Sequence, residues 1–400
     1  MATINDSDIT VGLSGRDLLK ASMKMQIEVL KAERYLNLLK KLGAINYEPK
    51  LSAEAGTSVT MYNTPRISGL GVTGDADMYT NAISLQSGSR TLSIRKHTLP
   101  IKYAMEGTER QQVSEFDLKG RAPKQATQWG KEVLLYQLMN QLGSNTATTL
   151  NAPGVYDVAV TATADRLILT GHNAAIAPSA TFKGYGSLAA GSISADESVD
   201  ADNPLTMADI MAARETIMAT NIGIPTWNRL QNPVEGTNVD AVLLVSTTGM
   251  NQLKNDAVTQ GQGFSLPQFV YAQIAGGEKV MMPSNAYIVE GIAIVEMPDN
   301  YLPRGVNSSS AAAVANTRRA IMVGANAVDF ALGKGYSFGG ATIPGFNVDV
   351  DEKYKPLNKQ GYLMASINGG FKKVQISGTG ANVGTSYDNA VYTFTHYSRT

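Results

Sequence analysis

A long excursion between two strand-like runs is the feature that most constrains this chain. The runs cover Thr57–Asn63 and Thr91–Tyr103, and the 27 residues from Thr64 to Arg90 separate them. A hairpin turn needs only about two to five residues, so this segment is far longer than a connection requires. A compact protein that keeps such a loop either leaves it disordered or uses it to reach another surface. With the buried helix expected soon after it, the excursion indicates a subunit of an assembly rather than an enzyme.

The two runs are expected to pair as a two-stranded ribbon. Leu92 and Ile94 alternate with Thr91, Ser93 and Arg95, which puts apolar and polar side chains on opposite faces. Isolated ribbons are only marginally stable in water, so this one requires a partner surface.

A first long helix is expected near the N-terminus. Gly15–Leu42 reads as one helix, because Ser14 with Asp17 provides a start signal, Gly43 provides a stop, and apolar residues recur at helical spacing. This helix packs either on its own domain or over a neighbouring subunit.

A second long helix is expected over Pro123–Leu142, with Gly143 directly after it. Proline suits the first turn of a helix, and the last turns here are apolar on nearly every face, which is typical of a buried helix. Gly130 in its interior suggests a close approach by another backbone.

The second half of the chain has the pattern of an α/β-type domain. The expected elements are a helix over Met207–Thr220, a buried strand over Asp240–Ser246, a short helix over Thr247–Asn255, and paired strands over Ala286–Val289 and Ile292–Glu296. Strand-like runs resume at Arg319–Val323, Gly345–Val350 and Tyr362–Ile376, while Ser144–Asn203 is irregular and Ser377–Thr400 is a strand or loop tail.

Composition narrows the class of protein. The 400 residues suffice for two or three domains, and 34 basic residues balance 34 acidic ones, which argues against a dedicated nucleic-acid binder. There is no cysteine, which excludes disulfides, thiolate catalysis and cysteine-ligated zinc. The N-terminus lacks the layout of a signal peptide, and no run of about 18 apolar residues could span a membrane. We therefore expect a protein made in a cytosol-like compartment.

No catalytic, cofactor or metal site is expected. The three histidines, His97, His172 and His396, are scattered, and the sequence contains neither a phosphate-binding loop nor a nucleophile elbow. Asp349, Asp351 and Glu352 form the densest carboxylate group, but their spacing fails the calcium-loop pattern. We interpret these acidic residues as a charged face that contacts Lys353, Lys355 or another subunit.

Three blocks carry a family resemblance. The first is Gly56–Thr60 leading to Arg66–Gly71, Gly74-Asp75 and the alternating strand; the second is Glu109–Gln112 with Phe116–Leu118, Trp129 and the helix to Gly143; the third is Arg318–Ala327, Tyr354–Asn358 and Gly369–Lys373. In this order they resemble the major capsid (coat) protein of large podophages, of the Schitoviridae-like group. The blocks span most of the chain, although Ser144–Asn203 and Ser377–Thr400 match only loosely.

The resemblance implies an α+β fold of the Hong Kong 97 type, with an N-terminal arm, an extended β-hairpin loop, a spine helix, and peripheral and axial domains. The implied segments are an arm over 1–50, an extended loop over 51–106, a peripheral domain with the spine helix over 107–206, an axial domain over 207–314, a return to the peripheral domain over 315–376, and a C-terminal tail over 377–400.

The resemblance also implies a function. Copies of the chain would form hexamers and pentamers of an icosahedral phage head, assembled in the host cytoplasm, which encloses double-stranded DNA without sequence specificity. Separate scaffolding, portal and decoration proteins are the implied partners, and no cofactor, membrane or enzymatic activity is implied. The alternatives are an encapsulin-like nanocompartment shell or, less favoured, a monomeric α/β enzyme or binding protein.

The same resemblance implies candidate subunit contacts. They are the charged residues of the extended loop and its stem, Arg66, Asp75, Asp77, Arg90, Arg95 and Lys96, and those of the acidic strand, Asp349, Asp351 and Glu352. Some relatives in the wider fold lock subunits together through a lysine of the extended loop. No lysine lies between Lys50 and Lys96 here, so we expect no such cross-link.

Overall fold

The computed structural model describes most of the chain's regular elements. The described residues are 9–10, 15–32, 34–49, 56–63, 88–104, 118–143, 167–169, 199, 204–218, 230, 239–259, 271–273, 279–281, 286–289, 291–305, 313–338, 341–355, 358–377 and 386–398.

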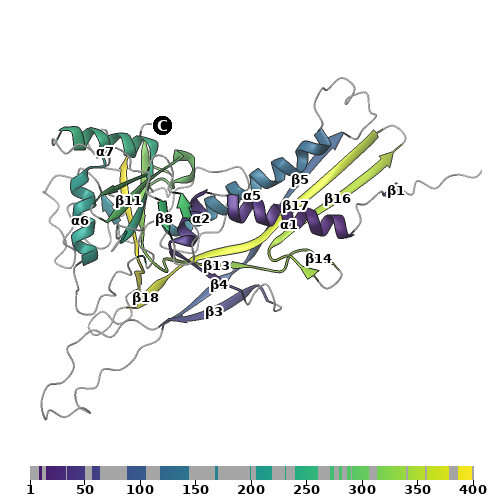
Figure 1. Cartoon of the computed structure of the whole chain (residues 1–400), viewed down its shortest axis with the longest axis horizontal. Helices are drawn as coiled ribbons and strands as arrows, with labels where there is room; N and C mark the ends of the chain where they lie inside the picture. The colour runs from purple at the N-terminus through teal and green to yellow at the C-terminus, as the bar shows by residue number, and fades with distance from the viewer. Residues whose placement is uncertain are drawn as a thin grey trace, which may run out of the picture.

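Two six-stranded sheets organise the molecule (Figure 1). The first sheet has the order β1-β16-β17-β13-β2, with β5 also paired to β17. Its strands are β1 (Ile9–Thr10), β2 (Ile45–Glu48), β5 (Arg95–Ala104), β13 (Val328–Leu332), β16 (Phe346–Lys355) and β17 (Asn358–Lys373). The 16-residue β17 holds this sheet together, because β16 pairs along one of its edges while β5 and then β13 pair along the other.

Three helices cover one face of the first sheet: α1 (Gly15–Ala32), α2 (Arg34–Lys41) and α5 (Leu118–Gly143). Helix α1 packs on β16, where the hydroxyl of Ser22 accepts a hydrogen bond from the Val348 amide at 2.9 Å. Helix α5 packs on β17 and β5 and lies beside α1.

Helices α1 and α2 occupy the range Gly15–Leu42 in which one helix was expected, and residue 33, between them, lies outside the described residues. Helix α2 turns its buried Leu36 and Leu39 into the core, and the hydroxyl of Tyr35 donates to the Glu296 carbonyl of the second sheet at 2.9 Å. The expected stop is confirmed, since Gly43 has a φ of +78° and the Ala44 amide donates to the Leu39 carbonyl at 2.9 Å.

Helix α5 differs from expectation at its start. It begins at Leu118, so Pro123 lies inside it rather than in its first turn. Near a helix end the missing N–H removes only one hydrogen bond, and the helix continues. The expected buried second half is confirmed, because every residue from Val133 to Gly143 is buried. Side chains rather than a backbone crowd Gly130: an added Cβ would lie 3.1–3.2 Å from atoms of Met25, Val29 and Ile367.

The second sheet has the order β10-β11-β7-β12-β20-β6. Its strands are β6 (Leu167–Leu169), β7 (Ala241–Ser246), β10 (Ala286–Val289), β11 (Ile292–Met297), β12 (Thr317–Val323) and β20 (Val391–Tyr397), and the helices α6 (Met207–Met218) and α7 (Thr247–Thr259) pack beside it. The expected elements are present, with α7 extending four residues beyond Asn255. Strand β20 comes from the segment read as a strand or loop tail, yet it lies between two other strands and is almost wholly buried.

Short elements complete the described chain. They are the ribbon of β3 (Ser58–Asn63) and β4 (Gly88–Ser93), the pairs β8 (Tyr271–Gln273) with β9 (Lys279–Met281), β14 (Ser337–Phe338) with β15 (Ala341–Thr342) and β18 (Gln375–Ser377) with β19 (Ser386–Asp388), and the 3₁₀ turn η3 (Asp299–Tyr301). No helix in the described ranges is long and apolar enough to cross a membrane.

Candidate assembly interface

The described foot of the extended loop is a two-stranded ribbon. Strands β3 and β4 pair antiparallel from Ser58 opposite Ser93 to Asn63 opposite Gly88. The expected single strand over Thr91–Tyr103 is wrong, because the chain leaves the ribbon at Ile94 and continues as β5 in the first sheet. At that point the Ile94 amide still donates to the Thr57 carbonyl at 2.9 Å, while its side chain is buried. The chain thus passes from the ribbon to the first sheet at Ile94.

The expected alternation of the ribbon is confirmed. Leu92 and Ile94 are buried against Ala331, with Val59 and Met61 packed beside them. On the other face Tyr62 is 75% exposed. The foot of the ribbon therefore finds the partner surface that it requires on the first sheet of its own chain.

Two glycines allow the ribbon to lie against that sheet. A Cβ on Gly370 of β17 would be 2.1 Å from the Ser93 carbonyl oxygen, which is backbone and cannot move aside. A Cβ on Gly333 would meet the Asn368 side chain at 2.4 Å and the Ile94 side chain at 2.5 Å. Any larger residue at position 370 would push the ribbon away from the sheet.

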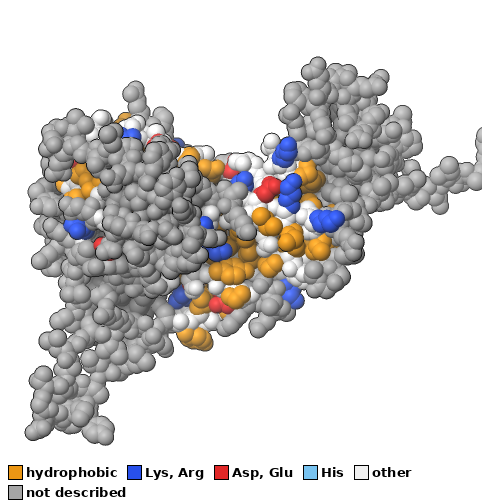
Figure 2. All heavy atoms as spheres, viewed as in Figure 1, with side chains coloured by type: hydrophobic (Ala, Val, Ile, Leu, Met, Phe, Trp, Pro, Cys, Tyr) orange, Lys and Arg blue, Asp and Glu red, His pale blue; other side chains and the backbone are white. Residues whose placement is uncertain are grey.

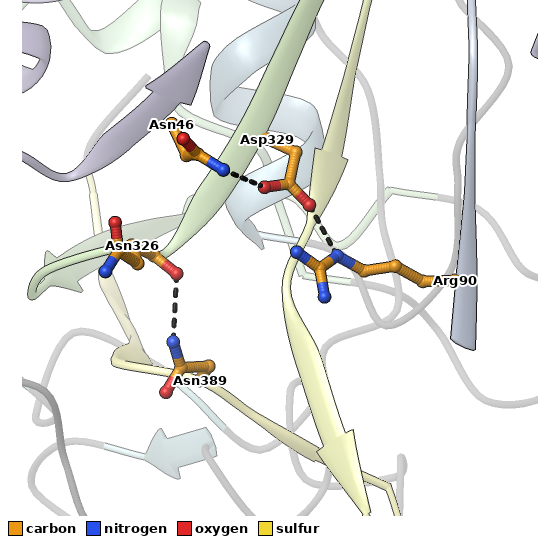
Figure 3. Close-up of polar contacts among 5 residues, drawn as sticks. All are labelled: Asn46, Arg90, Asn326, Asp329 and Asn389. Atoms are coloured by element: carbon orange, nitrogen blue, oxygen red, sulfur yellow. Dashed lines mark hydrogen bonds and ion pairs between the residues drawn. The ribbon is translucent and has the colours of Figure 1, made fainter. Parts of the chain in front are cut away.

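A buried carboxylate fastens the ribbon to the sheet (Figure 3). Asp329 of β13 is fully buried, and its Oδ2 accepts a hydrogen bond from Nε of Arg90 on the ribbon strand β4. Its Oδ1 accepts a hydrogen bond from Nδ2 of Asn46 on β2 at 3.1 Å. The Arg90 side chain is 12% exposed, so the ion pair is largely shielded from water. We call Arg90, Asp329 and Asn46 the ribbon clamp.

The joint between the two sheets lies next to the clamp. The chain passes from β12 to β13 through Asn326, which has a left-handed φ of +51°. Nδ2 of Asn389 donates to the Asn326 carbonyl at 2.9 Å (Figure 3). Nearby, Lys373 and Asp388 form a buried ion pair at 2.5 Å, and burial lowers the pKa of Lys373 although Asp388 opposes the shift. Polar contacts in one region of the molecule therefore hold both the ribbon on the first sheet and the junction between the two sheets.

The structure locates part of the expected contact set. Arg66, Asp75 and Asp77 lie outside the described residues. Arg90 is in the clamp, where it pairs within its own chain. Arg95 and Lys96 are exposed at the start of β5, directly after the ribbon.

The acidic strand lies in β16. Asp349 is exposed and sits opposite Met364 of β17, on the side of the sheet away from the helices. Asp351 and Glu352 continue the same strand, and the structure describes their backbone but not their side chains. The structure thus places Arg95, Lys96 and Asp349 on one sheet, but neither Arg95 nor Lys96 contacts Asp349 within the chain.

The histidine of β5, His97, adds no charge to this strand near neutral pH. Burial, and then the cation of Arg95, lower the pKa of His97 below its usual value. The imidazole is therefore neutral at pH 7 and adds no charge to this edge. Among the described residues, no three His, Cys, Asp or Glu side chains gather where they could hold a metal ion.

Sequence reasoning missed the partners of Arg90. Asp329 is a lone carboxylate within the otherwise apolar run from Ala327 to Leu332, and a buried charge of this kind requires a partner. That signal could have identified Asp329 as a site, but nothing in the sequence indicates Arg90 or Asn46 as its partners.

Comparison with solved structures defines the class of fold. The capsid asymmetric unit of cyanophage Pam1 matches with a TM-score of 0.57 at 16% identity, covering 89% of this chain and 91% of that one. The capsid of Ralstonia phage GP4 matches with a TM-score of 0.53 at 13% identity, covering 90% and 89%. The head structure of Helicobacter pylori bacteriophage KHP40 matches with a TM-score of 0.50 at 13% identity, covering 89% and 87%. The structure therefore has the α+β, Hong Kong 97-type coat fold.

The family follows from the sequence itself. The sequence profile of the phage capsid protein family matches residues 9–399, and the chain belongs to that family. It is a structural, non-enzymatic shell protein and a component of the virion capsid. No curated protein sequence matches the chain.

Proposed function

We propose that this chain is the major capsid protein of a Schitoviridae-like podophage, and that it forms hexamers and pentamers of an icosahedral head enclosing double-stranded DNA. The observation that carries the proposal is the clamped ribbon. Residues 64–87 join two strands that pair directly up to Asn63 and Gly88, so the foot of this loop is held on its own sheet, and the proposal assigns the remainder to contact with a neighbouring subunit. Assembly would take place in the host cytoplasm.

The surface that would receive a neighbour's ribbon is the part of the sheet face opposite the helices that the chain's own ribbon leaves uncovered, which we call the bare face. Tyr362 and Met364 of β17 are 37% and 39% exposed on it, beside Lys102 and Asp349. An exposed apolar strip with charges at its margins has the anatomy of an interface. Ribbon residues of one subunit would cover this strip on the next, and repetition by symmetry would make many weak contacts add up to a stable shell.

Charge complementarity would set the register of that contact. Arg66 of the ribbon would pair with the acidic strand of Asp349, Asp351 and Glu352. Asp75 and Asp77 would pair with Arg95 and Lys96 of the neighbour. Like charges placed opposite one another at an interface disfavour association, so the pairing is open to a charge-swap test.

The segments over 1–50, 51–106, 107–206, 207–314, 315–376 and 377–400 are proposed as arm, extended loop, peripheral domain, axial domain, peripheral return and tail. The second sheet combines β7 and β11 with β6, β12 and β20, which lie outside 207–314. Scaffolding, portal and decoration proteins would be separate chains.

The ribbon can be tested by shortening it. Replacing residues 64–87 by Asn-Gly joins Asn63 to Gly88 with a two-residue turn and keeps β3 and β4 paired. We expect the shortened protein to fold with an unchanged melting temperature but to form no shells, tubes or capsomer rings by negative-stain microscopy. The full chain, alone or with its scaffolding protein, should form them. Shells from the shortened protein would overturn the proposal, as would a full chain that stays a monomer of 42.6 kDa with every scaffold supplied by the phage.

Charge-swap variants test the register. Asp349→Arg should abolish assembly, and Arg66→Asp in the same chain should restore it, whereas Lys334→Glu at another exposed position should assemble normally. Equal assembly of Asp349→Arg and the unmodified chain would remove the acidic strand from the interface.

Subunits should carry no covalent cross-link. The extended loop has no lysine between Lys50 and Lys96 that could form an isopeptide bond. Mature heads boiled in SDS should therefore run as a single monomer band, and a ladder of multimers would refute this expectation. The same heads should contain DNA, whereas co-purified cargo enzymes in place of DNA would favour a nanocompartment shell.

A further inference from the structure

Two connections between the sheets lie side by side and are hydrogen-bonded to each other. The first leads from β12 of the second sheet to β13 of the first sheet, and the second leads from β19, which follows β17 through β18, into β20. The Gly324 amide donates to the Ala390 carbonyl at 2.8 Å, and Nδ2 of Asn389 donates to the Asn326 carbonyl at 2.9 Å (Figure 3). We call residues 324–327 and 389–390 the double crossing.

Each connection of the double crossing contains a residue other than glycine in left-handed backbone. Asn326 has a φ of +51° and Ala390 a φ of +54°. Asparagine enters this conformation more readily than most residues, whereas alanine enters it only at an energetic cost. Among the described residues other than glycine, only Asn316 shares the conformation. Because Ala390 is 1% exposed, the packing around it holds this backbone in place.

Buried charges stabilise the double crossing. Figure 2 shows Lys and Arg side chains at the surface of one face of the molecule, whereas Arg319 and Lys373 are 1% and 4% exposed. Lys373, the last residue of β17, forms an ion pair at 2.5 Å with Asp388, the last residue of β19. Nε2 of Gln375 donates to Oδ1 of the same carboxylate at 2.9 Å. The ion pair therefore connects the end of a first-sheet strand to the residue directly before the second connection.

Arg319 of β12 extends these contacts to the long helix α5. Its Nη1 donates to the carbonyl of Gly143, the last residue of α5, at 3.1 Å, and a cation is favourable at this end of a helix. A Cβ on Gly143 would lie 2.6 Å from Cγ of Pro303, whose carbonyl accepts a hydrogen bond from the Arg319 amide at 2.9 Å. Burial lowers the pKa of Lys373, Asp388 opposes this shift, and the cation of Arg319 adds to it. The three charged groups therefore act on one another.

We propose that the double crossing and its buried charges hold the two sheets at one fixed angle, and that this angle sets the curvature of the shell. The inference rests on the proposed shell function and deepens it by naming what determines shell size. Hydrogen bonds are directional, and strained backbone persists only where its surroundings determine it. A shell closes only when the rotation between neighbouring subunits has the right value. Contacts made by the first sheet and by the second sheet keep a constant relation only when the joint between them is rigid.

Glycine at both left-handed positions should release the joint and keep its hydrogen bonds. The variant Asn326→Gly with Ala390→Gly retains the two backbone carbonyls that accept those bonds, and glycine adopts left-handed backbone without strain. It should therefore fold, with a melting temperature within about 3 °C of the parent. Asn316→Gly is the matched control, because Asn316 has a φ of +58° but lies outside the double crossing.

The angle between the sheets is measured as the distance between two spin labels, and the absence of cysteine makes the labelling specific. Lys24→Cys on α1 and Asn251→Cys on α7 place one label at an exposed position beside each sheet. Pulsed dipolar electron spin resonance is recorded on the full-length protein diluted with unlabelled chain. The parent and Asn316→Gly should give one narrow distance, and the double glycine variant a distribution about twofold broader, because glycine removes the backbone restraint. Equal widths in all three proteins would overturn the inference.

A second variant tests the buried charges. Lys373→Met with Asp388→Leu removes both members of the ion pair, so no buried charge is left unpaired and the protein should fold. Its distance distribution should also be about twofold broader than that of the parent, because directional contacts are lost while apolar packing remains. A distribution as narrow as that of the parent would show that the ion pair does not hold the angle.

Shell diameter tests the proposed link to curvature. By negative-stain microscopy, the parent and Asn316→Gly, with scaffolding protein where assembly requires it, should form shells of one diameter. The double glycine variant should form tubes and shells of several diameters, and shells of the parental diameter would overturn the inference while the shell function stands. Leu244→Ala, which removes buried volume outside the double crossing, should lower the yield at an unchanged diameter. Absence of shells from the parent and every variant would count against the shell function and the curvature that depends on it, whereas the distances would still decide whether the joint is rigid.

Discussion

The two sheets of this protein bury their strands in different ways. Strand β7 of the second sheet is buried at all six positions, with Val242 and Leu244 in one apolar cluster and Leu243 and Val245 in another. Strand β17 of the first sheet alternates, since Leu363 is buried under the helices while its neighbour Met364 is 39% exposed. The second sheet completes its core within the chain. The first sheet is covered by helices on one face and by its own ribbon on part of the other, and the rest of that second face, around Tyr362 and Met364, stays exposed.

The two sheets also differ in the kind of contact that holds their strands in place. The second sheet is held by continuous apolar packing on both faces, whereas the ribbon on the first sheet is held by the buried ion pair of the clamp and by a glycine contact. Apolar packing is non-directional and requires no particular geometry. A hydrogen-bonded ion pair, in contrast, fixes the relative orientation of the two strands that it joins. The polar attachment is therefore suited to setting the angle at which the ribbon leaves the body.

The largest effect is expected at the clamp. Arg90→Ala leaves Asp329 buried with only Asn46 as a partner, which should cost about 3–5 kcal/mol of unfolding free energy. Replacing both members, as Arg90→Met with Asp329→Leu, should cost less than the single change because no buried charge is stranded. Urea denaturation of the free subunit measures both. An exposed control, Arg95→Ala, should change stability by about 0.5 kcal/mol or less, and a similar small effect for Arg90→Ala would show that the clamp does not hold the ribbon.

Truncation in the second sheet should have the next largest effect. Leu244 is fully buried, so Leu244→Ala should lower the unfolding free energy by about 2–5 kcal/mol through lost burial and a cavity. The denaturation midpoint should fall at an unchanged m-value. A loss below about 1 kcal/mol would mean that β7 is not packed on both sides, and the contrast between the sheets would disappear.

Acid should weaken the second sheet through His396, which lies fully buried in β20. Burial, with the nearby cation of Arg318, lowers the pKa of His396 to about 4 against the opposing hydrogen bond to the Tyr397 carbonyl. The unfolded chain binds the proton near pH 6.5 and the folded chain only near 4, so stability falls as pH decreases through this window. At pH of about 4.5 the loss should be about 2–3 kcal/mol.

The variant His396→Asn isolates this contribution. Asp209 has a pKa raised to about 6, chiefly by burial, and contributes the opposite pH dependence, but this contribution is common to both proteins and cancels in the difference. The stability of the parent minus that of the variant should decrease steadily as pH falls from about 6.5 to about 4. A difference that stays constant with pH would exclude His396 as the acid-sensitive group.

The smallest change in stability is expected on the bare face. Met364→Ala should alter the unfolding free energy by about 1 kcal/mol or less, because the side chain is already partly exposed. Shell yield should nevertheless fall several-fold, since a neighbouring ribbon would lose an apolar contact. Met23→Ala on α1, where the side chain is 51% exposed, should leave shell yield unchanged. Equal yields for both methionine variants would mean that the bare face stays open in the shell.

Local chemistry made several elements predictable. The stop of α2 at Gly43 and the tight turn at Gly291, which has a φ of +85°, follow from glycine's access to left-handed backbone. The start of α6 follows from Thr206 and Asp209, where the Asp209 carboxylate accepts hydrogen bonds from the Thr206 amide at 3.0 Å and its hydroxyl at 2.7 Å. Strand β7 was recognisable because a strand buried on both faces is apolar throughout.

Other features depended on partners distant in sequence. The run over Thr91–Tyr103 looked like one strand, but Ile94 divides it because β4 pairs with β3 while β5 pairs with β17, more than 250 residues further along. Strand β20 looked like a tail because its Thr, Tyr and His residues are polar in isolation, and they become buried only between β12 and β6.

The sequence by itself determined that this chain builds a reaching ribbon, a buried helix and a second α/β-type sheet, because each depends on periodicity, capping and turn residues that act over a few positions. Tertiary structure decided where the ribbon is fastened and which part of the first sheet stays exposed. Those properties arise from pairs such as Arg90 with Asp329, separated by 239 positions, and from the packing of three helices on one side of a sheet. A one-dimensional pattern does not contain such proximity, because it exists only after the chain has folded.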